Sequence, residues 1–232
     1  MNVLVHDDPA AEVADRLARA AEAGAHIALT GGSTPGKAYE RAAELGADWS
    51  GATLWWGDER CVPPDDELSN YAMAKAALLD RLPSGEGGPA VKRMKGEAGP
   101  NAAADDYERE LRSAFGEESP RLDWVLLGLG PDAHVASLFP GQPTLHARDR
   151  LAVGVEQAGH EPYVPRVTLT LPVLNAAREV VFLVTGADKA EAVRRAFGGD
   201  APNPDAPGSL VRPSAGELTL VLDSAAAAEI DA

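Results

Sequence analysis

The sequence has one cysteine, and this scarcity excludes several ways of building a stable or reactive site. Cys61 has no partner for an internal disulfide, and a lone thiol cannot form a Cys-rich metal site. Stability must therefore come from packing, and nothing around Cys61 favours a nucleophilic role.

Long apolar runs and an excess of basic residues are lacking too. No stretch approaches the roughly 20 apolar residues that a membrane-spanning helix needs, and Met1–Asp8 contains no basic segment followed by an apolar one. With 21 Lys and Arg against 36 Asp and Glu, the net charge of -15 repels nucleic acid and anionic membranes. We therefore expect a cytoplasmic protein without nucleic-acid or membrane partners. An anionic substrate would need a local cluster of Arg, Lys and backbone N–H groups.

What is present is an alternation of two kinds of segment. Short β-branched or Leu-rich runs predict strands at Asn2–His6, Ala25–Leu29, Thr53–Trp56, Leu122–Gly128, Val167–Thr170, Val180–Val184 and Leu218–Leu222. Ala-rich amphipathic periods predict helices at Pro9–Ala23, Pro35–Leu45, Tyr71–Arg81, Ala102–Phe115, Lys189–Phe197 and, at the end, Ala225–Ala228. Gly and Pro predict loops at Pro83–Pro100 and Gly198–Gly208.

This order predicts an α/β fold with three layers, α/β/α, built on a Rossmann-like, mainly parallel sheet. With 45% hydrophobic positions, the 232 residues suffice for one sizeable core, so we expect a single domain over residues 1–232. Ligands of such sheets bind beyond the carboxyl ends of the strands, so the loops that follow strands are the candidate sites.

The loop after the second predicted strand runs into a helix. Gly31 and Gly32 allow close backbone approach, while Ser33, Thr34 and the free N–H groups of the helix start suit an anion. The loop therefore indicates a phosphate site. The alternative is a tight turn in which a hydroxyl caps the helix.

Two enzyme signatures overlap this loop. Gly31 to Lys37 matches the G-x-x-x-x-G-K pattern of nucleotide hydrolases, but Ala38 has no hydroxyl for magnesium and Pro35 removes a backbone donor. Pro35 also stands where the nucleophile elbow G-x-S-x-G has its second glycine. Neither signature is favoured.

Three cations lie at the ends of other predicted strands. Arg60 stands beside Asp58 and Glu59, where an arginine can clamp a phosphate while an acid orients a neighbouring imidazole. Arg166 lies at the mouth of a strand and Lys189 follows another, so either can reach a phosphate. The alternative for each is a surface ion pair or a solvated charge.

The loop after the fourth predicted central strand carries the most information. Gly128-x-Gly130-x-x-Ala133 matches the permissive dinucleotide fingerprint. However, Pro140 would end the following helix within about two turns, too short for the usual crossover.

His134 follows Asp132 by two residues on this glycine-loosened turn. Histidine titrates near neutral pH and can take a proton from water while a carboxylate holds the imidazole. We therefore expect His134 to be catalytic and interpret the remaining histidines as structural or solvent-exposed: His6, His26, His146 and His160. No cluster has metal-ligand spacing, so no metal is expected.

Together these segments resemble the 6-phosphogluconolactonases, whose superfamily also contains the glucosamine-6-phosphate deaminases. The resemblance spans nearly the whole chain in family order and is carried by Gly31–Pro35, Trp56–Arg60, Val62–Pro63, Ser69–Tyr71, Leu127 through Gly141, Arg166–Thr170, Gly186 with Lys189, and Ser209–Val211. It implies a sugar-phosphate isomerase/deaminase-like fold. It also implies hydrolysis of 6-phospho-D-glucono-1,5-lactone to 6-phosphogluconate in the oxidative pentose phosphate pathway, without a metal or nucleotide cofactor.

The resemblance also implies roles for particular residues. His134 would be the general base that activates water, with Asp132 and Asp58 orienting it. Arg60 and Lys189 would hold the phosphate together with the loop Gly31, Gly32, Ser33 and Thr34, and Arg166 would lie in the substrate pocket. The partner would be a small phosphosugar lactone, and the protein a monomer or weak homodimer.

One position departs from the family. Glycine usually separates the aspartate and the histidine of the fourth loop, and this chain has Ala133. If that position requires a positive φ, alanine strains the turn by about 1 kcal/mol or displaces His134. We expect the fold to be kept and the activity to be lowered.

Two alternatives remain open. Glucosamine-6-phosphate deaminases share the phosphate loop and the Asp-x-His arrangement, but that branch resembles Ala-Phe-Asn-Glu-Pro after the histidine, with a catalytic glutamate, where this chain has Ala136–Pro140. A non-catalytic sugar-phosphate binding protein would keep Arg60, Lys189 and the glycine loop but would have no use for His134.

Overall fold

The computed structural model describes residues 1–116, 120–199 and 201–230, and its centre is a seven-stranded sheet in the order β1-β10-β9-β6-β2-β3-β5. Every pairing in this sheet is parallel. The strands are β1 (Asn2–Val5), β2 (His26–Leu29), β3 (Thr53–Trp56), β5 (Ala90–Val91), β6 (Trp124–Leu127), β9 (Glu179–Val184) and β10 (Glu217–Leu222). All but β5 were predicted as strands, whereas β5 lies in a stretch predicted as a loop.

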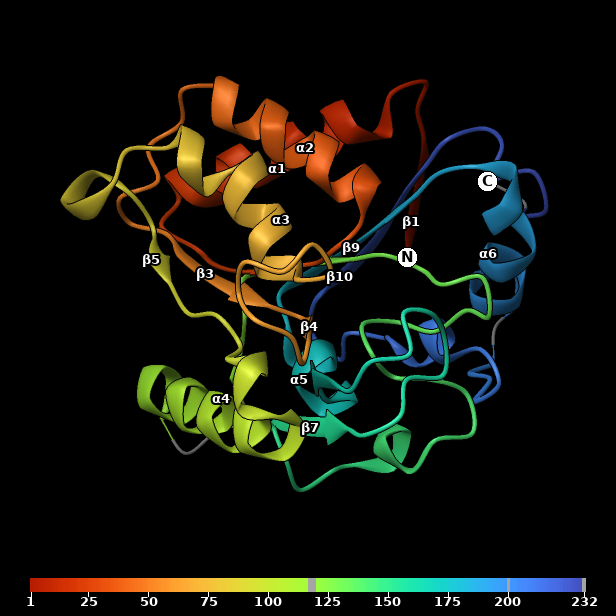
Figure 1. Ribbon diagram of the computed structural model, residues 1–232. Helices are drawn as coiled ribbons and strands as arrows, with labels where there is room; N and C mark the ends of the chain where they lie inside the picture. The colour runs from red at the N-terminus through yellow and green to blue at the C-terminus, as the bar shows by residue number, and fades with distance from the viewer. Residues whose placement is uncertain (117–119, 200, 231–232) are drawn as a thin grey trace.

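Helices cover both faces of the sheet, which confirms the three-layer α/β/α prediction. Figure 1 shows α1, α2 and α3 on one side and α4 and α5 on the other. The helices are α1 (Pro9–Glu22), α2 (Ser33–Glu44), α3 (Asn70–Ala77), α4 (Pro100–Phe115), α5 (Leu171–Ala176) and α6 (Ala190–Phe197). The predicted helix ending at Arg81 is shorter, because α3 gives way to a 3-10 turn at Leu79–Arg81.

A second, three-stranded antiparallel sheet was not predicted. It consists of β4 (Asp58–Arg60), β8 (Arg166–Leu169) and β7 (Ala152–Val155), so the predicted strand at Val167–Thr170 exists but lies outside the parallel sheet. The chain passes from one sheet to the other at Gly57. The Gly57 N–H donates to the carbonyl of Leu29 in the central sheet, and the Gly57 carbonyl accepts from the N–H of Leu169 in the second.

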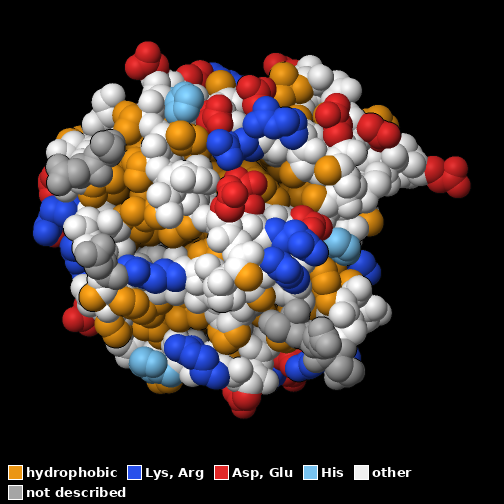
Figure 2. Space-filling model, turned by 180° about the vertical axis from the view of Figure 1, so that it is seen from behind, with side chains coloured by type: hydrophobic (Ala, Val, Ile, Leu, Met, Phe, Trp, Pro, Cys, Tyr) orange, Lys and Arg blue, Asp and Glu red, His pale blue; other side chains and the backbone are white. Residues whose placement is uncertain are grey.

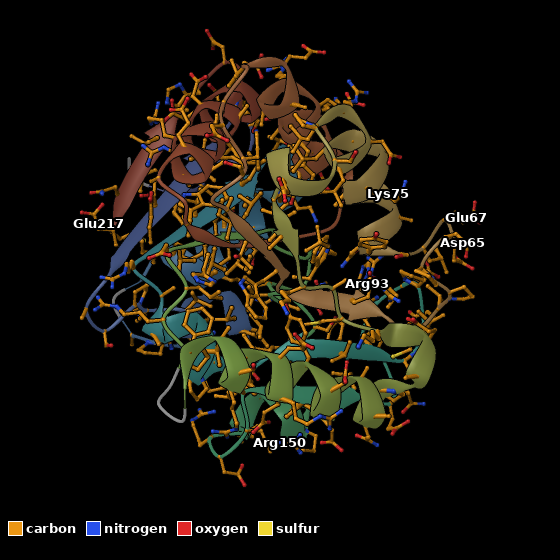
Figure 3. The ribbon with its side chains drawn as sticks, turned by 90° about the vertical axis from the view of Figure 1, so that its left-hand side faces the viewer. Asp65, Glu67, Lys75, Arg93, Arg150 and Glu217 are labelled. Atoms are coloured by element: carbon orange, nitrogen blue, oxygen red, sulfur yellow. The ribbon has the colours of Figure 1, made fainter. Side chains whose placement is uncertain are left out.

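Helix α4 holds this second sheet in place through charge. Arg150, just before β7, donates to Glu108 at 2.7 Å and to Asp105 at 2.5 Å, and both acids lie on α4. Figure 3 shows Arg150 beside this helix. The strand and the helix are therefore clamped together at the point where the chain enters β7.

Two buried tyrosines fix the carboxyl ends of strands that lead into candidate loops. The Tyr39 hydroxyl accepts from the N–H of Thr30 at 2.9 Å and donates to its carbonyl at 2.8 Å. The Tyr107 hydroxyl likewise accepts from the N–H of Trp56, the last residue of β3, and donates to the Trp56 carbonyl. The backbone leaving β2 and β3 is thus held by a side chain from a flanking helix.

Two short helices that the sequence predicts are replaced by turns. At Ala225–Ala228 the carboxylate of Asp223 accepts from the N–H of Ala226 at 2.7 Å, and the Asp223 carbonyl accepts from that of Ala227. A four-residue alanine run is too short to offset the cost of helix nucleation. The second such segment, after β6, is described with the site.

Charged side chains of both signs are found on the surface. On the face shown in Figure 2, Lys and Arg side chains are dispersed among acidic and apolar ones. No helix in the described ranges is long and apolar enough to cross a membrane.

Candidate active site

A cavity of about 250 Å³ lies where the loops after β2, β3, β6 and β9 meet. Because these strands are neighbours and parallel, their carboxyl ends share one edge of the sheet. The predicted site residues that line the cavity are Gly31, Gly32, Asp58, Arg60, His134, Arg166 and Lys189. Asn70 and His160 also line it, and neither was predicted as a site residue.

Asp132 and His134 form a close pair at this cavity. The Asp132 Oδ1 lies 2.5 Å from His134 Nδ1 and also accepts the His134 backbone N–H at 3.1 Å. Burial raises the pKa of Asp132, but the hydrogen bonds and charge of His134 outweigh it and lower that pKa to about 2. The ionised carboxylate can only accept, so Nδ1 carries the proton and Nε2 keeps its lone pair. Nε2 is therefore the basic nitrogen.

The close approach of this pair depends on Gly130. A methyl group added there would come within 2.0 Å of His134 Nδ1 and 2.8 Å of the Asp132 Oδ1. On another side, the ring of Phe139 lies 4.6 Å from the His134 ring, centroid to centroid. The imidazole is thus held by packing as well as by hydrogen bonds.

The turn that carries His134 contains two alanines in the left-handed region. Ala133 has φ 63° and Ala136 has φ 49°. A right-handed helix cannot include such residues, so the short helix expected before Pro140 gives way to turns, with an isolated bridge between Val135 and Leu138. The position of Ala133 therefore does require a positive φ, as considered in the sequence analysis. The hydrogen bond between His134 and Asp132 is nevertheless intact.

Asp58 does not orient His134 directly. Its Oδ2 accepts from the Ser137 hydroxyl at 2.6 Å, and its Oδ1 accepts from the Asn70 amide at 3.2 Å. Asp58 therefore reaches the histidine only through the segment that contains Ser137, three residues further along the chain. The expected role of Asp58 in orienting His134 stays a prediction, and Asp58 would exert it through this segment.

Glu59 is a buried carboxylate that fixes the start of α3. It accepts from the backbone N–H groups of Arg60, Asn70 and Tyr71, each at 2.7 Å, and from the Ser69 hydroxyl at 3.0 Å. Burial raises the pKa of Glu59, although the backbone donors partly offset that effect. The helix start is therefore held against β4, and Asn70 with it.

Two arginines reach the cavity with incompletely satisfied guanidinium groups. Arg60 donates to the carbonyl of Leu68 at 2.6 Å, and Arg166 donates to the carbonyls of His160 and Pro162 at 3.1 and 3.0 Å. The Nε of each arginine is buried without a hydrogen-bond partner in the described structure. Burial lowers the pKa of Arg166, against the opposing effect of nearby carboxylates. An anion would satisfy such donors.

The glycine loop contributes mainly backbone. Gly32, at φ 112°, is the N-cap of α2 and provides no side-chain acceptor for the first-turn N–H groups. Gly31 approaches Asn70 so closely that an added methyl would lie 1.9 Å from its Oδ1. Thr34 instead bonds the hydroxyl of Thr185 at 3.0 Å, and Ser33 is exposed and outside the cavity lining.

Sequence reasoning missed three side chains of this site. Asn70 stood in a noted motif at a helix start, but nothing in that motif shows that its amide would meet Asp58. Ser137 is completely buried beside Asp58, although serine is usually exposed. His160 was interpreted as structural or exposed, yet it lines the cavity with its ring centroid 5.7 Å from that of His134.

No group of three or more His, Cys, Asp or Glu side chains placed to hold a metal ion is found in the described ranges. The polar groups at the cavity are the pair of His134 and Asp132, three cations, the start of α2, and the side chains of Asp58, Asn70 and His160. Such a set can bind an anion and activate water.

Comparison with known proteins agrees with this geometry. A family model described as glucosamine-6-phosphate isomerases/6-phosphogluconolactonase matches residues 4–220, so the chain belongs to this family. The 6-phosphogluconolactonase of Nostoc sp. (strain PCC 7120) is 42% identical over 208 residues, covering 88% of this chain and 84% of the relative. The human 6-phosphogluconolactonase is 43% identical over 176 residues, 75% of this chain and 67% of the relative.

A solved structure supports the fold as a whole. The 6-phosphogluconolactonase from Trypanosoma cruzi has a TM-score of 0.86 at 28% identity, covering 100% of this chain and 97% of that one. The likeness therefore extends over both sheets.

Proposed function

We propose that this protein is a 6-phosphogluconolactonase, a single domain that hydrolyses 6-phospho-D-glucono-1,5-lactone to 6-phosphogluconate in the oxidative pentose phosphate pathway. The observation that carries the proposal is the 2.5 Å pair of His134 and Asp132 in a cavity that also contains Arg60, Arg166 and Lys189. A base and an anion site in one cavity match a substrate that has both an ester and a phosphate. We further propose that it acts in the cytoplasm as a monomer or weak homodimer.

The chemistry begins at Nε2 of His134. This nitrogen takes a proton from water while the water oxygen attacks the lactone carbonyl carbon, and ionised Asp132 stabilises the imidazolium that forms. The C–O bond of the ring then breaks, and the imidazolium returns the proton to the departing ring oxygen. The product is an open-chain acid that ionises at neutral pH. A lactone is an activated ester, so a positioned water and base suffice.

The phosphate end is assigned to the other groups of the cavity. Arg60 and Lys189 supply charge, and the backbone of Gly31 and Gly32 supplies N–H groups at the start of α2. We assign Arg166 to the substrate pocket because it lines the cavity.

The deaminase alternative has less support at the segment after the histidine. This segment contains Ser137, whose hydroxyl donates to Asp58, and Phe139, whose ring packs on His134. No carboxylate extends from this segment toward the imidazole, so a deaminase acid would have to come from elsewhere.

A direct assay tests the proposal. The lactone is generated in situ, and the rate of 6-phosphogluconate formation is measured after subtraction of the spontaneous hydrolysis rate. Glucosamine 6-phosphate is tested as a parallel substrate. We expect lactone turnover by the wild type and its loss in His134→Ala. Ammonia release from glucosamine 6-phosphate would indicate a deaminase, and full turnover by His134→Ala would remove the histidine from the mechanism. A protein that binds phosphosugars without turnover would be a binding module. Phosphosugar binding that survives loss of Arg60 and Lys189 together would contradict the phosphate assignment.

A further inference from the structure

His160 is the second histidine of the cavity, and its position is closely fixed. It lies on a segment that packs on Phe139, because a methyl added at the preceding Gly159 would lie 2.9 Å from the Phe139 side chain. The His160 carbonyl also accepts from Arg166 at 3.1 Å. The imidazole is therefore held in place before any ligand arrives.

The hydrogen bonding of this ring determines what its free nitrogen can do. Nδ1 of His160 lies 2.9 Å from the carbonyl oxygen of Glu161. A carbonyl oxygen only accepts, so Nδ1 must carry the proton. In the neutral ring Nε2 is then a pure acceptor, and no hydrogen-bond partner for it is found in the described ranges. The neutral His160 ring therefore has one unpaired acceptor, Nε2, and no free donor, on a residue that lines the cavity.

The location of His160 limits which part of the substrate it can meet. Its ring centroid is 5.7 Å from that of His134, so it lies at the reacting end of the substrate rather than at the phosphate. Around the reacting carbon of the lactone are the carbonyl oxygen, the ring oxygen and the hydroxyl on the adjacent carbon, C2. The two oxygens without hydrogen cannot bond to an acceptor. Among the substrate's own groups around this carbon, the C2 hydroxyl is the donor.

We propose that His160 is a specificity residue whose Nε2 accepts a hydrogen bond from the C2 hydroxyl of the lactone. This inference rests on the proposed lactonase function and extends it to sugar recognition. A substrate without that hydroxyl leaves the acceptor without its partner in the complex, which lowers the rate of its turnover. The bond also holds the reacting carbon next to Nε2 of His134.

The test compares wild type and one variant on two substrates, the normal lactone and an analogue. His160→Phe keeps a ring beside His134 and removes the acceptor, while the 2-deoxy lactone removes the donor. We expect the variant to lose about tenfold in kcat/KM on the normal lactone and the wild type to lose a similar factor on the 2-deoxy lactone. The variant should then lose little more when it meets the 2-deoxy lactone.

Controls separate this idea from a structural effect and from failure of the lactonase assignment. His146→Phe changes an exposed histidine outside the cavity and should leave both rates unchanged. His160→Ala provides a second loss of the acceptor if the phenylalanine perturbs folding, and circular dichroism checks both variants. Equal losses on the two substrates, or a His160→Phe enzyme as active as the wild type, would overturn the proposal. An inactive wild type would instead refute the lactonase function itself.

Discussion

Replacing Gly130 by alanine adds one methyl group at the point where it disturbs the catalytic pair most. That methyl would lie 2.0 Å from His134 Nδ1, whereas ordinary van der Waals contact begins near 3.4 Å, so the two must separate by about 1.4 Å. Gly130 does not have a positive φ, so alanine carries no backbone penalty there. The effect is therefore steric and confined to the pair of His134 and Asp132.

A misplacement of about 1 Å in a catalytic group costs on the order of 100-fold in rate. We therefore expect kcat/KM for lactone hydrolysis to fall by about two orders of magnitude in Gly130→Ala. The cost in stability should stay within about 1–3 kcal/mol, the usual range for a methyl forced into a packed site. Urea denaturation measures the second quantity and the lactone assay the first.

Gly128 supplies a matched control on the same segment. It also lines the cavity, but an alanine methyl there would have nothing within 4 Å. Gly128→Ala should therefore keep kcat/KM within about threefold of the wild type, since no reacting group moves. Wild-type turnover in Gly130→Ala would refute the reasoning, because His134 would then not be held where the structure places it or would not be the base.

Three further outcomes follow from the site. Ala133→Gly relieves about 1–2 kcal/mol of left-handed strain, loses about 0.8 kcal/mol of methyl burial and costs about 0.4–1 kcal/mol of chain entropy. The free energy of unfolding should thus change by less than about 1 kcal/mol, and a loss above about 2 kcal/mol in urea denaturation would contradict the strain. Turnover should change little, because Asp132 already holds His134; this replaces the expectation from the sequence that Ala133 lowers the activity. Since the pKa of Asp132 is lowered to about 2, its charge stabilises the fold above pH 3.8, and this contribution is lost as the pH falls toward 2. Asp132→Asn should therefore flatten the acid limb of the stability profile, and an unchanged slope between pH 4 and pH 2 would count against the pairing. Burial raises the pKa of Cys61 to about 11, so roughly 1 in 3,000 thiols is ionised at pH 7.5. Iodoacetamide should modify the native protein slowly and the unfolded protein readily, as mass spectrometry would show, and rapid native labelling would contradict the burial.

The parallel sheet could be predicted from the sequence because its strands are continuous apolar runs. Runs such as Thr53–Trp56 and Val180–Val184 are buried on both faces, and their composition shows it. The second sheet could not be predicted, because β4 is the charged triplet Asp58–Arg60. β4 pairs with β8, more than 100 residues further along the chain, and Asp58 is buried against Ser137, so no local pattern records these partners.

The site was predictable where it follows strands and unpredictable where it depends on contacts across the chain. His134 and Asp132 are neighbours in sequence, so their pairing could be read directly. His160 lies 26 residues after His134 in a stretch without strand or helix periodicity, and its place at the cavity depends on close packing of Gly159 against Phe139. Packing of that kind is a property of the folded chain and not of any short segment.

The passage of the chain through Gly57 from the central sheet into the antiparallel one has a consequence for how the protein loses activity. Asp58, Arg60 and Arg166 come from one sheet, while His134 follows a strand of the other. Separating the sheets would therefore dismantle the cavity even if each kept its strands. Heat inactivation should accordingly coincide with the cooperative melting of the whole protein. An inactive but otherwise folded species should not accumulate on the way.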